Sequence, residues 1–234
     1  MKIGFVGLGI MGLPMAGHLV AAGHELQVTS RTPKVLEGAV TAMLAAEAAR
    51  GAEIVITMVP DTPDVEQVLF GEGGIVEMAA PGTVVIDMST ISARATMGFA
   101  ARLAERGVLL LDAPVSGGEV GAKNATLSIM VGGEKAAYEK ALPVLQKLGR
   151  NVVYVGGSGA GQKTKSVNQV VGALNLLAAV EGVRLAKAAG LDTDSTLSAV
   201  GGGAAGSWMW ANLGPKIAAG DGKPGFMIRL QQKD

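Results

Sequence analysis

Lys165 stands beside two side-chain amides in a segment that opens a long helix-forming stretch, residues 159–189. Positions three and four apart share one face of a helix, so Asn168 and Gln169 are expected on the face that carries the Lys165 amine. Lys163 lies about 200° around the helix from Lys165 and is expected on a different face.

An amine in this setting could donate a proton to a carbonyl oxygen that is being reduced, because the developing alkoxide needs a proton and electrostatic support. Burial favours this role, since it lowers the pKa of a lysine toward neutrality. The amides would position the amine or a substrate carboxylate without adding charge. The alternative is an ordinary solvated lysine, although a face shared with Asn168, Gln169 and Gly172 is not typical of a solvated surface.

A glycine-rich turn near the N-terminus follows the apolar run of residues 2–6 and precedes a helix expected over Leu13–Ala22. Its residues are Gly7, Leu8, Gly9, Ile10, Met11 and Gly12. In this context the three glycines are typical of a dinucleotide site: they permit a tight turn, close approach of a pyrophosphate, and helix packing on the strand. A structural turn without a cofactor is the alternative. Together with the lysine, the turn predicts carbonyl reduction.

The residues after the second expected strand, Glu25–Thr29, indicate which dinucleotide would bind. An acidic residue there would accept the ribose hydroxyls of NAD, but this chain has Ser30, Arg31 and Thr32. An arginine and hydroxyls suit a 2′-phosphate, so NADP is favoured over NAD. In the alternative interpretation Arg31 is an exposed residue that merely stacks on adenine.

Composition limits the classes of function. The 234 residues are 49% hydrophobic with a mean hydropathy of +0.38, and the formal net charge is zero. Zero charge argues against nucleic acid or an anionic membrane as a partner. The absence of cysteine excludes disulfides and thiolate metal sites, and no metal site is predicted. The first apolar stretch is broken by glycines and Pro14, so we expect a soluble, cytoplasmic protein without a membrane span.

Apolar runs alternate with helix-forming stretches as far as residue 158. The expected strands after the second are 53–59, 83–87, 108–112, 127–131 and 151–155, with helices over 93–106 and 134–148. Thr32-Pro33 is expected to begin another helix, within a helix-forming stretch that reaches Arg50. This alternation predicts an α/β fold with a doubly wound parallel sheet.

After Gly159 no strand pattern returns. One long helix is expected over Gln162–Ala189, about 40 Å at 1.5 Å per residue, with shorter helices over 194–200 and 207–219. We therefore expect a cofactor-binding domain over residues 1–158. Residues 159–234 would form an interdomain helix and part of an all-helical second domain, which ends at Asp234 as if incomplete.

Three further strand ends carry polar groups or glycines where ligands of α/β sheets bind. Val59-Pro60 is either a proline turn or a cofactor contact. Ser89-Thr90 supplies hydroxyls to a nicotinamide or substrate, or caps a helix. Ser116, Gly117 and Gly118 could form a nest for a carboxylate or a plain turn. Asp112 before them is expected to cap or orient this loop rather than act as a base.

Taken together, these segments resemble the β-hydroxyacid dehydrogenases, which include 3-hydroxyisobutyrate dehydrogenase, tartronate semialdehyde reductase and the glyoxylate/succinic semialdehyde reductases. The matching pieces are residues 4–16, Asp112 to Gly118, Gly159 to Asn168, residues 223–226 and Lys233-Asp234. The resemblance implies a Rossmann domain, a helical second domain, and a homodimer or homotetramer for the full-length protein.

The resemblance also implies roles for individual residues. Lys165 would be the catalytic acid/base, and Ser116 to Gly118 would hold the substrate carboxylate with Asn168 beside them. Thr90 and the loop Val59-Pro60 would contact the cofactor. Lys233 would also reach the cofactor, and Phe226 and Asp234 would line the cleft, Phe226 toward the substrate and Asp234 toward the cofactor.

Two departures from the family pattern stand out. The segment between Arg31 and Glu53 is short, so the usual third strand is expected to be missing, and family members continue past Asp234. Glu119 and residues 121–127 look closer to the tartronate and glyoxylate/succinic semialdehyde reductases. The leading hypothesis is reduction of such a small carboxylate-bearing aldehyde with NADPH. The alternatives are NAD-dependent 3-hydroxyisobutyrate oxidation and a non-catalytic dinucleotide-binding module; an imine reductase is disfavoured because those relatives generally lack the lysine.

Overall fold

The structure is a computed structural model that describes residues 1–222 and 232–233. The chain divides into two compact units, Met1–Lys165 and Ser166–Asp234. The first unit is built on one sheet, and the described part of the second is helical. The domain boundary after residue 158 stays a prediction.

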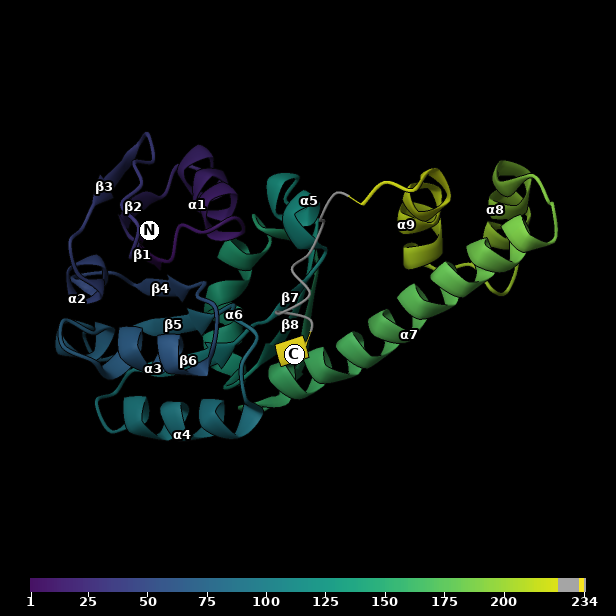
Figure 1. The fold of residues 1–234 in the computed structure, drawn as a ribbon. Helices are drawn as coiled ribbons and strands as arrows, with labels where there is room; N and C mark the ends of the chain where they lie inside the picture. The colour runs from purple at the N-terminus through teal and green to yellow at the C-terminus, as the bar shows by residue number, and fades with distance from the viewer. Residues whose placement is uncertain (223–231, 234) are drawn as a thin grey trace. The chain divides into compact units, whose positions relative to one another are not determined.

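The strands of the sheet are β1 (Lys2–Val6), β2 (Glu25–Thr29), β3 (Ala39–Thr41), β4 (Ile54–Thr57), β5 (Val84–Asp87), β6 (Leu109–Asp112), β7 (Val115–Ser116), β8 (Leu127–Gly132) and β9 (Gly149–Gly156). Their order is β3-β2-β1-β4-β5-β6-β8-β7, and β9 pairs with β8. From β3 to β6 all pairs are parallel, so the carboxyl ends of these strands meet at one edge. The expected α/β architecture is confirmed (Figure 1).

The helices of the first unit are α1 (Gly12–Ala21), α2 (Ala45–Ala49), α3 (Thr62–Phe70), α4 (Ala93–Ala104), α5 (Gly118–Lys123) and α6 (Lys135–Leu145), with a 3₁₀ turn at Ile75–Glu77. They cover both faces of the sheet. Residues of α1, α5 and α6 share one core cluster with the sheet, whereas residues of α2, α3 and α4 share the other.

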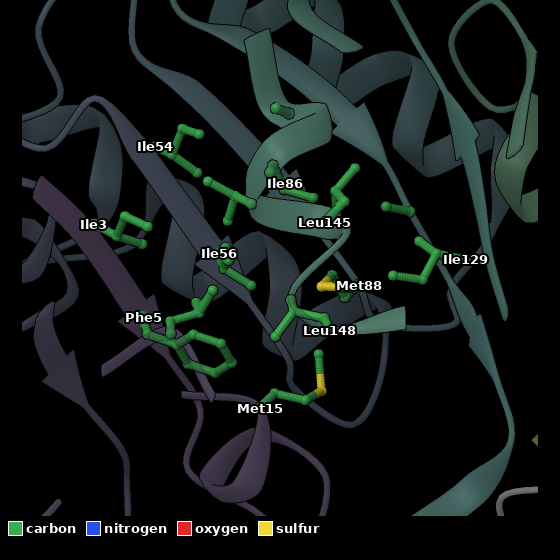
Figure 2. Packing of buried hydrophobic residues seen from close by; sticks show 14 of the residues in the cluster. Ile3, Phe5, Met15, Ile54, Ile56, Ile86, Met88, Ile129, Leu145 and Leu148 are labelled. Carbon is green, nitrogen blue, oxygen red and sulfur yellow. The ribbon is translucent and has the colours of Figure 1, made fainter. Parts of the chain in front are cut away.

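Alternation along the strands explains the two clusters, because successive side chains of a strand point to opposite faces. Ile54 and Ile56 of β4 join the α1 side, whereas Val55 joins the α3 side. Figure 2 shows the α1 side, where Phe5 of β1, Met15 of α1 and Leu148 belong to one cluster and Met15 points toward Leu148. The unbroken apolar strands of the sequence are thus buried on both faces.

The expected helix from Thr32-Pro33 is wrong. The chain after β2 has no regular structure until β3, which pairs parallel with β2 through Leu26↔Ala39, Gln27↔Val40 and Val28↔Thr41. Gly38 has a φ of +80°, which a right-handed helix does not accommodate. The third strand that was expected to be missing is therefore present in a three-residue form, and only Ala45–Ala49 of the helix-forming stretch is helical.

The sheet is mixed at its other edge. Strand β8 pairs antiparallel with β6 and β7, and parallel with β9. The apolar pattern of a buried strand carries no information about its direction, so the sequence could not predict this reversal. The reversal makes β7 run beside β8 and places Ser116 opposite Ser128.

Helix α7 (Ala160–Ala188) begins in the first unit and continues through the second, ending before Gly190 with its φ of +68°. In the second unit α8 (Thr193–Gly201) and α9 (Trp208–Ala219) follow, each with the bounds expected to within two residues. Their core is Trp210 with Ala179 and Val183. Among the described helices α7 has the length and apolar composition to cross a membrane, a property that long helices of soluble proteins share.

Candidate active site

The turn between β1 and α1 contains three glycines for two different reasons. Gly7 has a φ of +104°, and a Cβ there or at Gly12 would collide with main-chain atoms of Met58 or Gly7. A Cβ at Gly9 would meet nothing within 4 Å, and its φ lies outside the left-handed region. Contacts within the described chain therefore do not require glycine at position 9, whereas a phosphate close to the main chain would. The turn fits a dinucleotide pyrophosphate.

The other residues of this turn link it to β2 and open α1. Leu8 is buried, and its N–H donates to Ser30 Oγ at 3.2 Å. Ile10 is exposed, and Met11 occupies the N-cap position of α1 without a side-chain cap. The first N–H groups of a helix have no partner within the helix and favour an anion.

Arg31 is available for a charged ligand at the end of β2. Its side chain is 84% exposed, and Nη1 lies 3.4 Å from Asp64 Oδ1. Such an exposed ion pair contributes little free energy, so a 2′-phosphate could displace it. Thr32 next to it is also exposed, which leaves a hydroxyl and a guanidinium for the adenosine end of the cofactor.

Hydrogen bonds join the loops after β4 and β5. Val59 N–H donates to Ser89 Oγ at 3.0 Å, and Ser89 N–H donates to Asp87 Oδ1 at 3.1 Å. Ser89 and Thr90 do not cap the next helix, because Ser92 caps α4 through Ala95 N–H. The helix-cap alternative for Ser89-Thr90 is thereby removed.

Asp87 is a fully buried carboxyl beneath these loops. Burial raises the pKa of Asp87 to about 6, against hydrogen bonds from Ser89 and Thr57 that lower it. Thr57 Oγ1 donates to Asp87 Oδ1 at 2.8 Å, while Oδ2 is buried without a hydrogen-bond partner among the described residues. The carboxyl fixes the carboxyl ends of β4 and β5 to each other.

The segment Ser116 to Gly118 joins the last residue of β7 to the first residue of α5. Gly117 and Gly118 have φ values of +128° and +59°, which favour glycine at both positions. His18 Nε2 on α1 lies 3.0 Å from the carbonyl oxygens of both Ala122 and Lys123, so it must be the protonated nitrogen. This contact connects the helix after the glycine turn to the helix after the proposed carboxylate loop.

Asp112, at the end of β6, accepts hydrogen bonds from the start of α7. Gly159 N–H donates to Oδ1 and Gln162 N–H to Oδ2, both at 2.9 Å. Burial raises the pKa of Asp112, and these main-chain hydrogen bonds oppose that rise. The carboxylate thus occupies the positive end of the helix that carries Lys165, rather than orienting its own loop alone.

The two lysines of this helix differ as their spacing predicts. Lys165 is 6% exposed, whereas Lys163 is exposed. Asn168 and Gln169 are half-buried, and Asn168 Nδ2 donates to Gln169 Oε1 at 2.8 Å. A buried amine one helical turn before two linked amides is unusual for a solvated face, and it fits a proton donor.

The structure gathers the predicted site residues of the first unit along the carboxyl edge of the parallel strands. Lys233 lies in the second unit, and Phe226 and Asp234 lie outside the described residues. Gln162, which was not among the residues predicted from the sequence, is 1% exposed and lies one turn before Lys165. Its spacing of three from the lysine was the available signal.

Two family models match the chain in succession. The model for the NAD binding domain of 6-phosphogluconate dehydrogenase matches residues 2–156. The model described as NAD-binding of NADP-dependent 3-hydroxyisobutyrate dehydrogenase matches residues 159–234.

Relatives and solved structures agree with these matches. The 2-hydroxy-3-oxopropionate reductase of Escherichia coli (strain K12) is 46% identical, over 100% of this chain and 82% of the relative. Mycobacterium tuberculosis 3-hydroxyisobutyrate dehydrogenase with L-serine has a TM-score of 0.88 at 36% identity, covering 99% of this chain and 82% of that one. Psf3 in complex with NADP+ and 2-OPP has a TM-score of 0.89 at 26% identity, covering 99% of this chain and 84% of that one.

Proposed function

The chain belongs to the β-hydroxyacid dehydrogenase family, and we propose that it reduces a small carboxylate-bearing aldehyde to the hydroxyacid with NADPH. It is an NAD(P)-dependent oxidoreductase. The observation that carries the proposal is the buried amine of Lys165 at the start of α7, in the unit that also holds the glycine turn and the loop Ser116–Gly118.

In the proposed reaction, NADPH, when bound, would supply the hydride for the carbonyl carbon. Lys165 donates a proton from Nζ to the carbonyl oxygen, which completes the hydroxyl group. The Ser116 hydroxyl and the main-chain N–H groups of Gly117 and Gly118 hold the carboxylate. The amides of Asn168 and Gln169 orient the amine or the carboxylate.

The cofactor contacts are proposed from the first unit. The turn Gly7–Gly12 would hold the pyrophosphate, Ser30–Thr32 the adenosine end, and Val59-Pro60 with Thr90 the nicotinamide end. Support for NADP comes from Arg31 and from the description of the matching family as NADP-dependent. Lys233 and Asp234 remain predicted cofactor contacts, and Phe226 remains a predicted substrate contact.

The substrate proposal follows from the relatives. The 2-hydroxy-3-oxopropionate reductase, whose substrate is tartronate semialdehyde, is 46% identical to this chain. The 3-hydroxyisobutyrate dehydrogenase of Pseudomonas aeruginosa is 36% identical, and NAD-dependent oxidation of 3-hydroxyisobutyrate is the second candidate. The names of these relatives are consistent with a soluble metabolic enzyme. The proposal also includes a cytoplasmic location, a homodimer or homotetramer, and the absence of membrane or nucleic-acid partners.

A panel of substrates tests the proposal. NADPH and NADH consumption would be followed with tartronate, succinic and methylmalonate semialdehydes and with glyoxylate, and the reverse reaction with 3-hydroxyisobutyrate. The proposal expects the highest kcat/KM for NADPH with one of the first two aldehydes or glyoxylate. A preference for NAD with 3-hydroxyisobutyrate would favour the second candidate, and cofactor binding without turnover of any substrate would favour a non-catalytic module.

A further inference from the structure

Gln162 makes two side-chain hydrogen bonds that lie on either side of Thr90. Its Nε2 donates to Ser89 O at 2.8 Å, and its Oε1 accepts from Ile91 N–H at 3.1 Å. One side-chain amide thus satisfies a main-chain acceptor and a main-chain donor in the loop after β5. Because the Gln162 side chain is only 1% exposed, water cannot readily replace either bond.

The main chain of Gln162 is held independently of its side chain. Its N–H donates to Asp112 Oδ2, and Gly159 N–H donates to the other oxygen of the same carboxylate. Next to it, a Cβ at Gly161 would collide with the carbonyl oxygens of Asp112 and Met130. The first turn of α7 therefore packs directly on the ends of β6 and β8, while the Gln162 side chain reaches the end of β5.

Lys165 lies three residues after Gln162 on the same helix, so the two side chains leave from one face. A turn of α-helix is rigid, and the contacts that fix Gln162 therefore also fix the main chain of Lys165. At its other end the Gln162 side chain holds both neighbours of Thr90, the proposed cofactor contact. No other described side chain hydrogen-bonds to both Ser89 and Ile91.

We propose that Gln162 is a positioning residue that fixes the turn carrying Lys165 against the Ser89–Ile91 loop. The inference rests on the proposed function of Lys165 as the proton donor. Proton and hydride transfer to one carbonyl group require the amine and the cofactor loop to keep a fixed separation, and a misplacement of about 1 Å can lower a rate about 100-fold.

The test replaces Gln162 by Met, which keeps the length of the side chain and removes both hydrogen bonds. We expect kcat to fall about 30- to 100-fold, while the Kd of NADPH from fluorescence titration changes less than about threefold. The solvent deuterium isotope effect on kcat should rise, because proton transfer from a displaced amine limits the rate more strongly. In the cofactor-free protein, amide hydrogen exchange should quicken in residues 89–91 and 159–165.

Thr83→Val is the matched control. Thr83 is buried, and its Oγ1 donates to Ala52 O at 3.2 Å near the amino ends of β4 and β5, the opposite edge of the sheet. The control also loses a buried side-chain hydrogen bond to the main chain, and its melting temperature should fall. Its kcat and isotope effect should stay within about twofold of wild type, because the bond lies far from the proposed site.

Lys165→Met separates the two proposals. If Lys165→Met keeps wild-type kcat, both the proposed proton donor and the inference fail. If Lys165→Met is inactive while Gln162→Met is less thermostable but keeps wild-type kcat and isotope effect, the inference alone is overturned. If Gln162→Met does not fold, Gln162→Glu takes its place, because glutamate keeps the acceptor for Ile91 N–H and loses the donor to Ser89 O. The same loss of kcat is then expected. A wild-type kcat in Gln162→Glu would overturn the inference.

Discussion

Lys163 and Lys165 have the same side chain and lie two residues apart on α7, yet only Lys165 is buried. The sequence predicted this contrast, because two residues of a helix differ by about 200° around the axis. It could not predict how the helical turn before the amine is held. Asp112 and Gln162 make the hydrogen bonds that hold this turn, and their partners lie 47 to 73 residues away in the chain.

Arg31 carries the proposed preference for NADPH. Arg31→Ala should raise the Kd of NADPH by about 10- to 100-fold, the size expected for a charge-assisted contact with phosphate, and change the Kd of NADH less than about threefold. Fluorescence titration with each cofactor measures both. Arg150→Ala, which removes an exposed arginine at the start of β9, is the control.

A different result would show that Arg31 does not select NADPH. If the Kd values of NADPH and NADH rise by the same factor, Arg31 stacks on the adenine common to both and does not read the 2′-phosphate. The choice between the cofactors would then have to come from another part of the site.

Asp87 should make folding stability depend on pH with a definite sign. Burial raises its pKa from the ordinary 3.8 to about 6 in the folded protein, so between these pH values the unfolded chain releases a proton that the native protein keeps. The contribution of Asp87 therefore decreases as pH rises through this window, by at most about 3 kcal/mol at about 1.4 kcal/mol per pKa unit.

Asp87→Asn tests this sign, because asparagine keeps the acceptor for Thr57 and Ser89 but cannot ionise. Urea unfolding of both proteins at several pH values between about 4 and 7 gives the difference in unfolding free energy. The variant should gain stability relative to wild type as pH rises through the window. Parallel curves for the two proteins would show that the buried carboxyl does not titrate there.

At the scale of the element, the turn between β1 and α1 contains a position where a substitution should weaken cofactor binding without lowering the stability of the fold. Gly9→Ala places a methyl group where nothing lies within 4 Å, so the melting temperature should stay close to wild type. The Kd of NADPH should rise about tenfold or more, equivalent to about 1.4 kcal/mol, because the methyl group obstructs the pyrophosphate.

Gly17→Ala is the control for this change, since a Cβ at Gly17 also meets nothing within 4 Å but lies within α1. It should leave the Kd of NADPH unchanged and stabilise the helix by up to about 1 kcal/mol. An unchanged NADPH affinity in Gly9→Ala would mean that the cofactor does not approach the main chain at this turn.

Elements with strong periodicity were predictable from the sequence, and those fixed by tertiary pairing were not. Strands β1, β4 and β5 are largely apolar runs, β2 alternates polar and apolar residues, and all four appear where expected. The helix expected from Thr32-Pro33 failed because Gly38 has a φ of +80° and because residues 39–41, which include β-branched Val40 and Thr41, pair with β2. The direction of β8 could not be predicted, since side-chain alternation is the same in both directions.

At the scale of the whole molecule, the chain comprises two compact units, Met1–Lys165 and Ser166–Asp234, and helix α7 begins in the first and continues in the second. The first unit contains the glycine turn, the strand-end loops and Lys165. Because strand pattern is lost after Gly159, the sequence predicts a boundary after residue 158, and that boundary stays a prediction. The family matches at residues 2–156 and 159–234 identify what each part resembles.

The most direct test of the account is the kcat of NADPH-dependent aldehyde reduction for Lys165→Met beside Lys163→Met. The two variants remove the same charge from the same helix, one from a buried and one from an exposed position. We predict that Lys165→Met lowers kcat about 10²- to 10⁴-fold with the Kd of NADPH little changed. The kcat of Lys163→Met should stay within about twofold of wild type. Equal activity of the two variants would contradict the assignment of Lys165 as the proton donor.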